Sequence, residues 1–318
     1  MAQNKFKGLG IALITPFKSD GEVDYEALTR LVEYQIRNGV DFLCIMGTTA
    51  ETPCLSADEK KILKKMLVER VAGRVPLLMG CGGNNTAAVV KDLKEGDWSG
   101  IDGILSVCPY YNKPSQEGLY QHFKAIAEAS PVPVVLYNVP GRTGDRKSTR
   151  LNSSHVLYNV PGRTGVNMSA ETTLRLARDF ENIVAVKEAS GNMTQLEDVI
   201  KNKPRDFDVL SGDDGITYPL ITMGAVGVIS VIGNALPAEF SRMVRMALNG
   251  DYEHARIIHH KFSDLFKLLF VDGNPAGVKA MLHAMGMIEN QLRLPLVPTR
   301  LTTMEKISSI LKELDIRY

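Results

Sequence analysis

An excess of charge of either sign is absent from this chain, which carries 37 Lys and Arg residues against 36 Asp and Glu and has a net charge of +1. No basic stripe or acidic tail points to nucleic acid or to an anionic membrane surface. No apolar run approaches the length of a transmembrane helix, and the opening residues lack the apolar core of a signal peptide. These absences favour a cytoplasmic globular protein that binds neither nucleic acid nor a membrane.

Cysteine is scarce as well. The chain has only four, at scattered positions: Cys44, Cys54, Cys81 and Cys108. They are too few for a disulfide framework and lack the spacing of a zinc knuckle, so we expect reduced, buried thiols. The six histidines lie mostly in helical patterns and do not form a ligand set. The sequence therefore predicts neither a metal nor a cofactor.

Short apolar runs alternate with amphipathic stretches, which is the pattern of β-strands followed by α-helices. Predicted strands cover residues 10–15, 42–46, 75–79, 103–107, 132–138, 183–187, 208–211 and 227–231. Predicted helices include residues 25–38, 57–71, 116–129, 170–180 and 237–248, followed by 252–270, 275–285 and 302–314. This order predicts an α/β fold, a (β/α)8 TIM barrel with additional C-terminal helices. We assign residues 1–235 to the barrel, and residues 236–318 to its last helix and the C-terminal helical region.

Residues 183–191, Ile-Val-Ala-Val-Lys-Glu-Ala-Ser-Gly, are the stretch around which the other motifs are arranged. Four apolar residues indicate a buried strand of a parallel sheet, and the strand ends on Lys187. There the lysine amine points into the mouth of a barrel, where desolvation disfavours its ammonium form. The free amine can attack a carbonyl carbon and form a Schiff base. The alternative is a lysine that merely extends to solvent.

One segment interrupts the alternating pattern. Residues 135–144, Val-Leu-Tyr-Asn-Val-Pro-Gly-Arg-Thr-Gly, recur unchanged as residues 156–165, with a polar, basic linker between the copies. A repeat that occurs only twice is not a solenoid, and a long loop without structure is uncommon inside a compact domain. We interpret residues 145–165 as a duplication, either an artefact of sequence assembly or a segment that loops out. A genuine inserted lid is the alternative.

Polar motifs follow the predicted strands, where the active sites of barrels are built. The residues that stand out in these motifs are Thr48, Thr49, Tyr110, Tyr111, Tyr137, Arg142, Gly212 and Ile229. Each motif taken alone has a structural interpretation, such as a turn with a helix cap or a packed tyrosine. Their shared position on one rim favours an active site.

Taken together, the motifs resemble those of the pyruvate-dependent class I aldolase superfamily, and within it the dihydrodipicolinate (4-hydroxy-tetrahydrodipicolinate) synthase family. Gly-Thr-Thr-Ala-Glu at 47–51 and Val-Lys-Glu-Ala-Ser-Gly at 186–191 mark the superfamily. Tyr-Asn-Val-Pro-Gly-Arg-Thr-Gly at 137–144 marks the synthases, and sialic-acid lyases on the same fold lack its arginine. The resemblance runs from Phe6 to the C-terminal helices and is interrupted only by the repeat.

The resemblance implies a lyase that condenses pyruvate with L-aspartate 4-semialdehyde in lysine and diaminopimelate biosynthesis. The catalytic residues that it implies are Lys187, Thr48, Tyr111, Tyr137 and the duplicate Tyr158, and the substrate-binding residues are Thr49, Gly212, Ile229, Arg142 and the duplicate Arg163. Lys187 forms the imine with pyruvate, and the threonine at 48 and two tyrosines relay protons. Thr49 and the Ile229 backbone hold the pyruvate carboxylate, and the arginine meets the carboxylate of the second substrate.

The resemblance also implies contacts between subunits. The family equivalent of Tyr111 reaches into a neighbouring subunit's site, so we expect a homotetramer built as a dimer of dimers. An allosteric lysine site is implied at Asn84 and Tyr110. The chain departs from the lysine-sensitive pattern at Ala88, where such members carry a glutamate that pairs with the ligand's amine.

Two alternatives stay open: a pyruvate-dependent aldolase that acts on a sugar acid, and an inactive chain whose barrel cannot close because of the duplication. If the chain folds, we expect the first copy to supply the strand. Building the strand from the second copy would bury residues 153–155, Ser-Ser-His. Each buried polar group without a partner costs on the order of 1–3 kcal/mol. Looping out the duplicate costs only about 2–3 kcal/mol. Tyr137 and Arg142 are therefore predicted in the site, and Tyr158 and Arg163 in a mobile excursion beside it.

Overall fold

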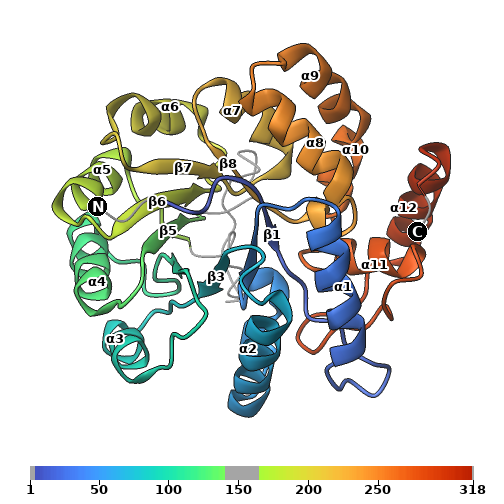
Figure 1. Ribbon diagram of the computed structural model, residues 1–318, viewed down its shortest axis with the longest axis horizontal. Coiled ribbons are helices and arrows are strands. Elements are labelled where there is room, and N and C mark those ends of the chain that lie inside the picture. Colours follow the sequence, from blue (N-terminus) through green and yellow to red (C-terminus); the bar gives the residue numbers. More distant parts are fainter. Residues whose placement is uncertain (1–3, 140–164, 317–318) are drawn as a thin grey trace, which may run out of the picture.

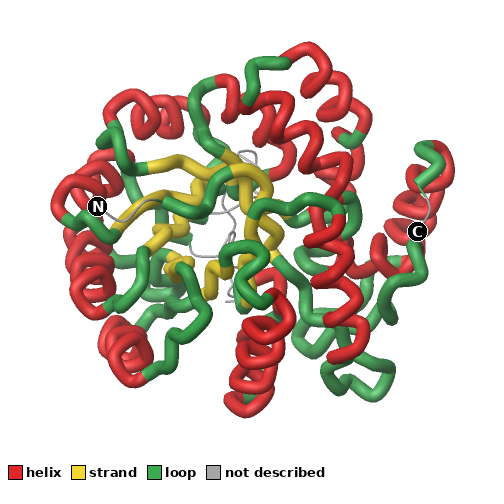
Figure 2. Tube along the Cα trace, in the orientation of Figure 1, coloured by secondary structure: helices red, strands yellow, loops and turns green. Residues whose placement is uncertain are grey.

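The computed structural model describes residues 4–139 and 165–316. Eight parallel strands follow one another around a closed barrel, in which β8 (Gly227–Ser230) pairs with β1 (Gly8–Ala12). Helices surround this ring of strands (Figure 1, Figure 2). The predicted (β/α)8 TIM barrel with additional C-terminal helices is confirmed.

The remaining strands are β2 (Phe42–Ile45), β3 (Leu77–Gly80), β4 (Gly103–Val107), β5 (Val134–Asn138), β6 (Ile183–Glu188) and β7 (Asp208–Ser211). The helices around them are α1 (Tyr25–Arg37), α2 (Ala57–Val71), α3 (Thr86–Glu95), α4 (Gln116–Ala129), α5 (Ala170–Asp179), α6 (Met193–Asn202), α7 (Thr217–Thr222) and α8 (Pro237–Leu248). The C-terminal helices are α9 (Tyr252–Lys261), α10 (Ser263–Leu268), α11 (Ala276–Ala284) and α12 (Leu301–Glu313). Short 3-10 helices are η1 (Thr48–Ala50), η2 (Thr52–Cys54), η3 (Asp214–Ile216) and η4 (Ile232–Asn234).

Two expected elements differ most from the structure, while β3 and β5 each begin two residues later than expected. The first strand covers residues 8–12 instead of 10–15, because Thr15 leaves the ladder and donates its hydroxyl to the Ala50 carbonyl. The single helix expected at 252–270 is two helices, α9 and α10. They separate at Phe262, which buries its ring in the core and adopts φ −107° and ψ 4° at the end of α9.

Apolar side chains fill both faces of the strands. Inside the barrel, a buried cluster includes Phe42, Leu78, Val135, Leu210 and Ile229. Two larger clusters lie between the strands and the surrounding helices. Burial on both faces accounts for the continuous apolar runs that marked the strands in the sequence.

The first copy of the repeat supplies β5. Residues 134–138 pair with β4 on one side and with β6 on the other. The barrel therefore closes, and the alternative that the duplication prevents its closure is wrong. The side chain of Asn138 accepts a hydrogen bond from the Met168 amide and donates one to Asn167, so the start of the first copy meets the chain that follows the second. Residues 140–164, which include most of the second copy, lie outside the described residues.

Of the C-terminal helices, α9 and α10 lie beside α7 and α8, whereas α11 and α12 lie on the side of the barrel that carries α1 (Figure 1). Arg293, between α11 and α12, donates to both carboxylate oxygens of Glu59 on α2, at 2.8 and 2.6 Å. Glu59 also closes the capping box of α2, because it accepts from the Ser56 amide while Ser56 accepts from the Glu59 amide. One carboxylate therefore stabilises a helix start and its contact with the C-terminal region.

In the described part of the chain, no helix combines the length and the apolar character needed to cross a membrane.

The Glu59 contact predicts an acid-sensitive step in stability. Hydrogen bonds from Arg293 lower the pKa of Glu59 from 4.5 to about 2 in the folded chain. Because the folded pKa lies below the unfolded one, this carboxylate stabilises the folded state above about pH 4.5 and loses that effect as the pH falls towards 2. We expect the free energy of unfolding to fall less steeply across this window in Glu59→Gln than in the unaltered chain, as measured by urea denaturation. Glu69→Gln, an exposed change on the same helix, is the control, and equal slopes in all three proteins would contradict the prediction.

Candidate active site

Lys187 lies at the carboxyl end of β6 with its side chain inside the barrel. It is only 6% exposed, so the alternative of a lysine that extends to solvent is wrong. Tyr137 of β5 is its register partner, and Lys187 Nζ lies 4.3 Å from the centre of the Tyr137 ring. Burial raises the pKa of the Cys44 thiol on β2 to about 11, and the Lys187 charge pulls it the other way. The amine is thus held in an apolar interior beside one phenol.

Gly212, directly after β7, leaves room for the stem of this lysine. A Cβ atom at this position would lie 3.2 Å from Lys187 Cε and only 2.7 Å from Ala189 Cβ. The Gly212 amide donates to the Glu188 carbonyl at 2.8 Å, which holds the ends of β6 and β7 together. Any side chain here would displace either the lysine or the strand ends.

The two adjacent threonines form the start of η1, which two residues separate from the end of β2. Thr49 is buried, and its Oγ1 accepts a hydrogen bond from Asn274 Nδ2 at 2.9 Å, whereas Thr48 is exposed. The turn is held from within by the Thr52 hydroxyl, which donates to the Gly47 carbonyl at 2.8 Å. The sequence motif therefore forms a fixed loop on the carboxyl rim of the barrel.

Ile229 occupies the middle of β8, where it pairs with Gly10 and is buried. Asp214, in η3, accepts hydrogen bonds from the amides of Val231 and Ile232 at 3.1 and 2.9 Å. This buried carboxylate fixes the backbone just beyond Ile229. The sequence alone does not reveal this contact, because it joins two separate loops.

Glu188 follows Lys187 but points to the outer face of the strand, as alternation requires. Its buried carboxylate accepts from Asn138 Nδ2 at 3.1 and 3.0 Å, from the Ser190 amide at 2.9 Å and from Gln195 Nε2 at 3.3 Å. Desolvation raises the pKa of Glu188, and these hydrogen bonds oppose the shift. The network ties the end of β6 to β5 and α6, and so fixes the backbone that carries the lysine.

The tyrosines after β4 lie at the surface of the single chain. Tyr111 is 71% exposed and has φ +75°, a left-handed conformation that is strained for a bulky residue. Tyr110 is also exposed, and so is Asn84, which follows β3. Three other predicted site residues, Arg142, Tyr158 and Arg163, lie outside the described residues. The described chain brings together Lys187, Tyr137 and Gly212. Thr49 lies in η1 after β2, and Ile229 lies in β8, which β7 separates from β6 and β1 separates from β2.

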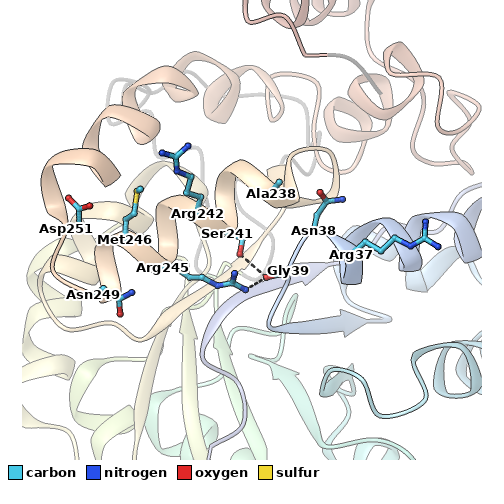
Figure 3. A pocket seen from close by; sticks show the side chains of 10 residues that line it. All are labelled: Arg37, Asn38, Gly39, Ala238, Ser241, Arg242, Arg245, Met246, Asn249 and Asp251. Atoms are coloured by element: carbon cyan, nitrogen blue, oxygen red, sulfur yellow. Dashed lines mark hydrogen bonds between the residues drawn. The ribbon is translucent and has the colours of Figure 1, made fainter.

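A separate hollow of about 580 Å³ lies at the opposite end of the barrel (Figure 3). Its lining includes Gly39, whose carbonyl accepts from Ser241 at 2.8 Å and from the Arg245 guanidinium. Gly39 precedes β2, so this hollow opens at the amino ends of the strands, away from Lys187. Within the described residues, no group of three or more His, Cys, Asp or Glu side chains is placed to hold a metal ion.

Comparison with known proteins gives consistent matches along the chain. The model of the dihydrodipicolinate synthetase family matches residues 5–150 and 146–314. The 4-hydroxy-tetrahydrodipicolinate synthases of Phocaeicola vulgatus and Parabacteroides distasonis are 64% and 62% identical over 317 residues, with full coverage of both chains. The crystal structure of dihydrodipicolinate synthase from Aquifex aeolicus has 41% identity and a TM-score of 0.88, and covers 98% of this chain and 99% of its own.

The space at Gly212 predicts a sharp loss on substitution. We expect Gly212→Ala to slow imine formation on Lys187 by at least about tenfold, because small displacements of a reacting group cost that much or more. Borohydride trapping with pyruvate, followed by mass spectrometry, measures the rate. Gly83→Ala is the control, since a Cβ atom there meets only Val89 Cγ2 at 3.6 Å. Unchanged trapping in Gly212→Ala would show that the lysine does not need this space.

Proposed function

The chain belongs to the dihydrodipicolinate synthetase family, its function is that of a 4-hydroxy-tetrahydrodipicolinate synthase, and we propose that its reaction runs through an imine on Lys187. The observation that carries the proposal is the buried amine at the end of β6, enclosed by Tyr137 and Gly212. The substrates are pyruvate and L-aspartate 4-semialdehyde. The names of the relatives do not favour the sugar-acid alternative.

In the proposed reaction, the free amine of Lys187 attacks the keto carbon of pyruvate, and water leaves as the imine forms. Loss of a proton from the pyruvate methyl group gives an enamine, whose carbon attacks the aldehyde carbon of the second substrate. The amine of that substrate then attacks the imine carbon, closes the ring and releases Lys187. One water is lost overall, and the lysine returns as a free amine.

Proton transfer in this scheme falls to Tyr137, Thr48 and Tyr111. Tyr137 is supported by its position, since its ring faces the reacting amine. Tyr111 acts from a neighbouring subunit, and its exposure and left-handed backbone support a side chain that projects away from its own barrel. We accordingly propose a homotetramer arranged as a dimer of dimers, in the cytoplasm.

Thr49 and the backbone at Ile229 hold the pyruvate carboxylate. Asn274 holds the side chain of Thr49 on the carboxyl rim, and Asp214 holds the backbone just beyond Ile229 in β8. Asn84 and Tyr110 border the proposed lysine site. The missing carboxylate at Ala88 argues for weak lysine inhibition.

Residues 145–165 are, in this proposal, an insertion that the catalytic barrel does not use. The family matches overlap within the linker between the copies, which supports a duplication of one family segment. Because the first copy supplies β5, Arg142 binds the carboxylate of the second substrate, and Tyr158 and Arg163 have no catalytic role.

Trapping with borohydride tests the central step. Reduction in the presence of pyruvate is expected to leave one adduct, on Lys187, and Lys187→Ala is expected to lose it. Lys279 is the internal control: burial lowers its pKa to about 8, but its amine is ion-paired with Glu51 at 2.5 Å. An adduct on Lys279 instead would refute the assignment.

The duplicated tyrosines form a matched pair for a second test. Tyr137→Phe is expected to lower kcat at least about 100-fold, in the range of a lost acid–base group, while Tyr158→Phe is expected to retain near-normal activity. Steady-state assays of both variants measure the difference. A greater loss in Tyr158→Phe would show that the second copy occupies the site.

A further inference from the structure

A side chain of the C-terminal region reaches the rim loop that carries the proposed carboxylate-binding threonine. Asn274, between α10 and α11, donates from Nδ2 to Thr49 Oγ1 at 2.9 Å across 225 residues of sequence. Both residues are at least nine-tenths buried. A buried contact of this kind fixes the threonine and also determines which hydrogen bonds its hydroxyl can still make.

The same two segments meet a second time, one helical turn further on. The Lys279 amide bonds to the Pro275 carbonyl, and its ammonium pairs with Glu51 at 2.5 Å, with both side chains fully buried. The Arg293 amide donates to the other oxygen of Glu51 at 3.1 Å. The C-terminal region therefore contacts the rim loop at two residues, Thr49 and Glu51, and Thr49 has little freedom to move relative to Asn274.

The direction of the Asn274 hydrogen bond leaves the threonine with one chemical role. An amide nitrogen only donates, so Thr49 Oγ1 is the acceptor, and the single hydroxyl hydrogen remains to be donated elsewhere. No described residue accepts a hydrogen bond from this hydroxyl. A carboxylate accepts only, so a hydroxyl held as a donor matches it, and a donated bond into the hydroxyl oxygen strengthens the bond it gives.

We propose that Asn274 is a positioning residue that keeps the Thr49 hydroxyl as a hydrogen-bond donor to the carboxylate of the α-keto acid substrate. The inference rests on the proposed function, in which Thr49 holds the pyruvate carboxylate. It adds a residue that selects for an acid over an uncharged carbonyl compound without touching the substrate.

Replacement by aspartate separates this role from simple packing. Asn274→Asp keeps the size of the side chain but offers only acceptor oxygens, so the Thr49 hydrogen turns towards it and is lost to the substrate. Asn274→Ala removes the partner but leaves the hydroxyl free to donate. We expect the KM for pyruvate to rise about tenfold or more in Asn274→Asp and less in Asn274→Ala, with kcat changing less than KM in both.

A purely structural role predicts the reverse order, because the alanine creates a cavity and the isosteric aspartate does not. Thermal unfolding of each variant records that effect separately. If Asn274→Ala raises the KM more than Asn274→Asp does, the inference is overturned.

A Thr49→Val background tests whether the aspartate acts through the hydroxyl or by direct repulsion of the substrate. With no hydroxyl at position 49, the two Asn274 variants are expected to give the same KM, as measured by a double-mutant cycle. A KM that stays higher in Asn274→Asp than in Asn274→Ala would mean direct repulsion and would overturn the inference.

Borohydride trapping at graded pyruvate concentrations gives the same comparison without the second substrate. If the unaltered chain formed no pyruvate adduct on Lys187, the proposed function would fall together with the inference, whereas adducts formed with equal pyruvate dependence in all variants would overturn the inference alone.

Discussion

Burial of one amine inside a closed ring of strands is the constraint on which the rest of the site depends. Lys187 can lie inside the barrel only because Gly212 has no side chain and because the Tyr137 ring offers a face to the cation. The next residue, Glu188, turns outward and is buried as well, which requires the hydrogen bonds from Asn138, Ser190 and Gln195. The end of β6 thus carries both the interior amine, on Lys187, and the outer polar network, around Glu188.

The sequence was sufficient for those features that depend on short stretches of chain. The strands were predictable because parallel strands buried on both faces are continuous apolar runs, and Lys187 was recognisable as the polar end of one such run. A helix was expected between each pair of strands, but the bounds of α3, α6 and α7 were not predicted. The break at Phe262 was missed because it depends on a ring reaching the core, which the local helical pattern does not reveal.

The contacts that position the site could not be predicted in this way. Asp214 bonds to the amides beyond Ile229, and Asn274 bonds to Thr49, but each pair is distant in sequence and is brought together only by the completed fold. The choice between the two copies of the repeat was different, because it followed from what precedes each copy. Apolar residues precede Val135, whereas serines and a histidine precede Val156, and β5 contains Val134–Asn138.

The contacts of the C-terminal region with Thr49 and Glu51 of the rim loop have a consequence for the order in which parts of the chain fold during synthesis. When β8 has left the ribosome, every strand of the barrel is available, but Asn274, Lys279 and Arg293 have not yet been added. Glu51 then still lacks the cation that balances its charge, and burying it alone is costly. The loop that carries Thr49 consequently reaches its final form only after α11 and the segment up to Arg293 have docked. A chain interrupted before that point would contain all eight strands and Lys187, yet the loop that carries Thr49 would not be fixed.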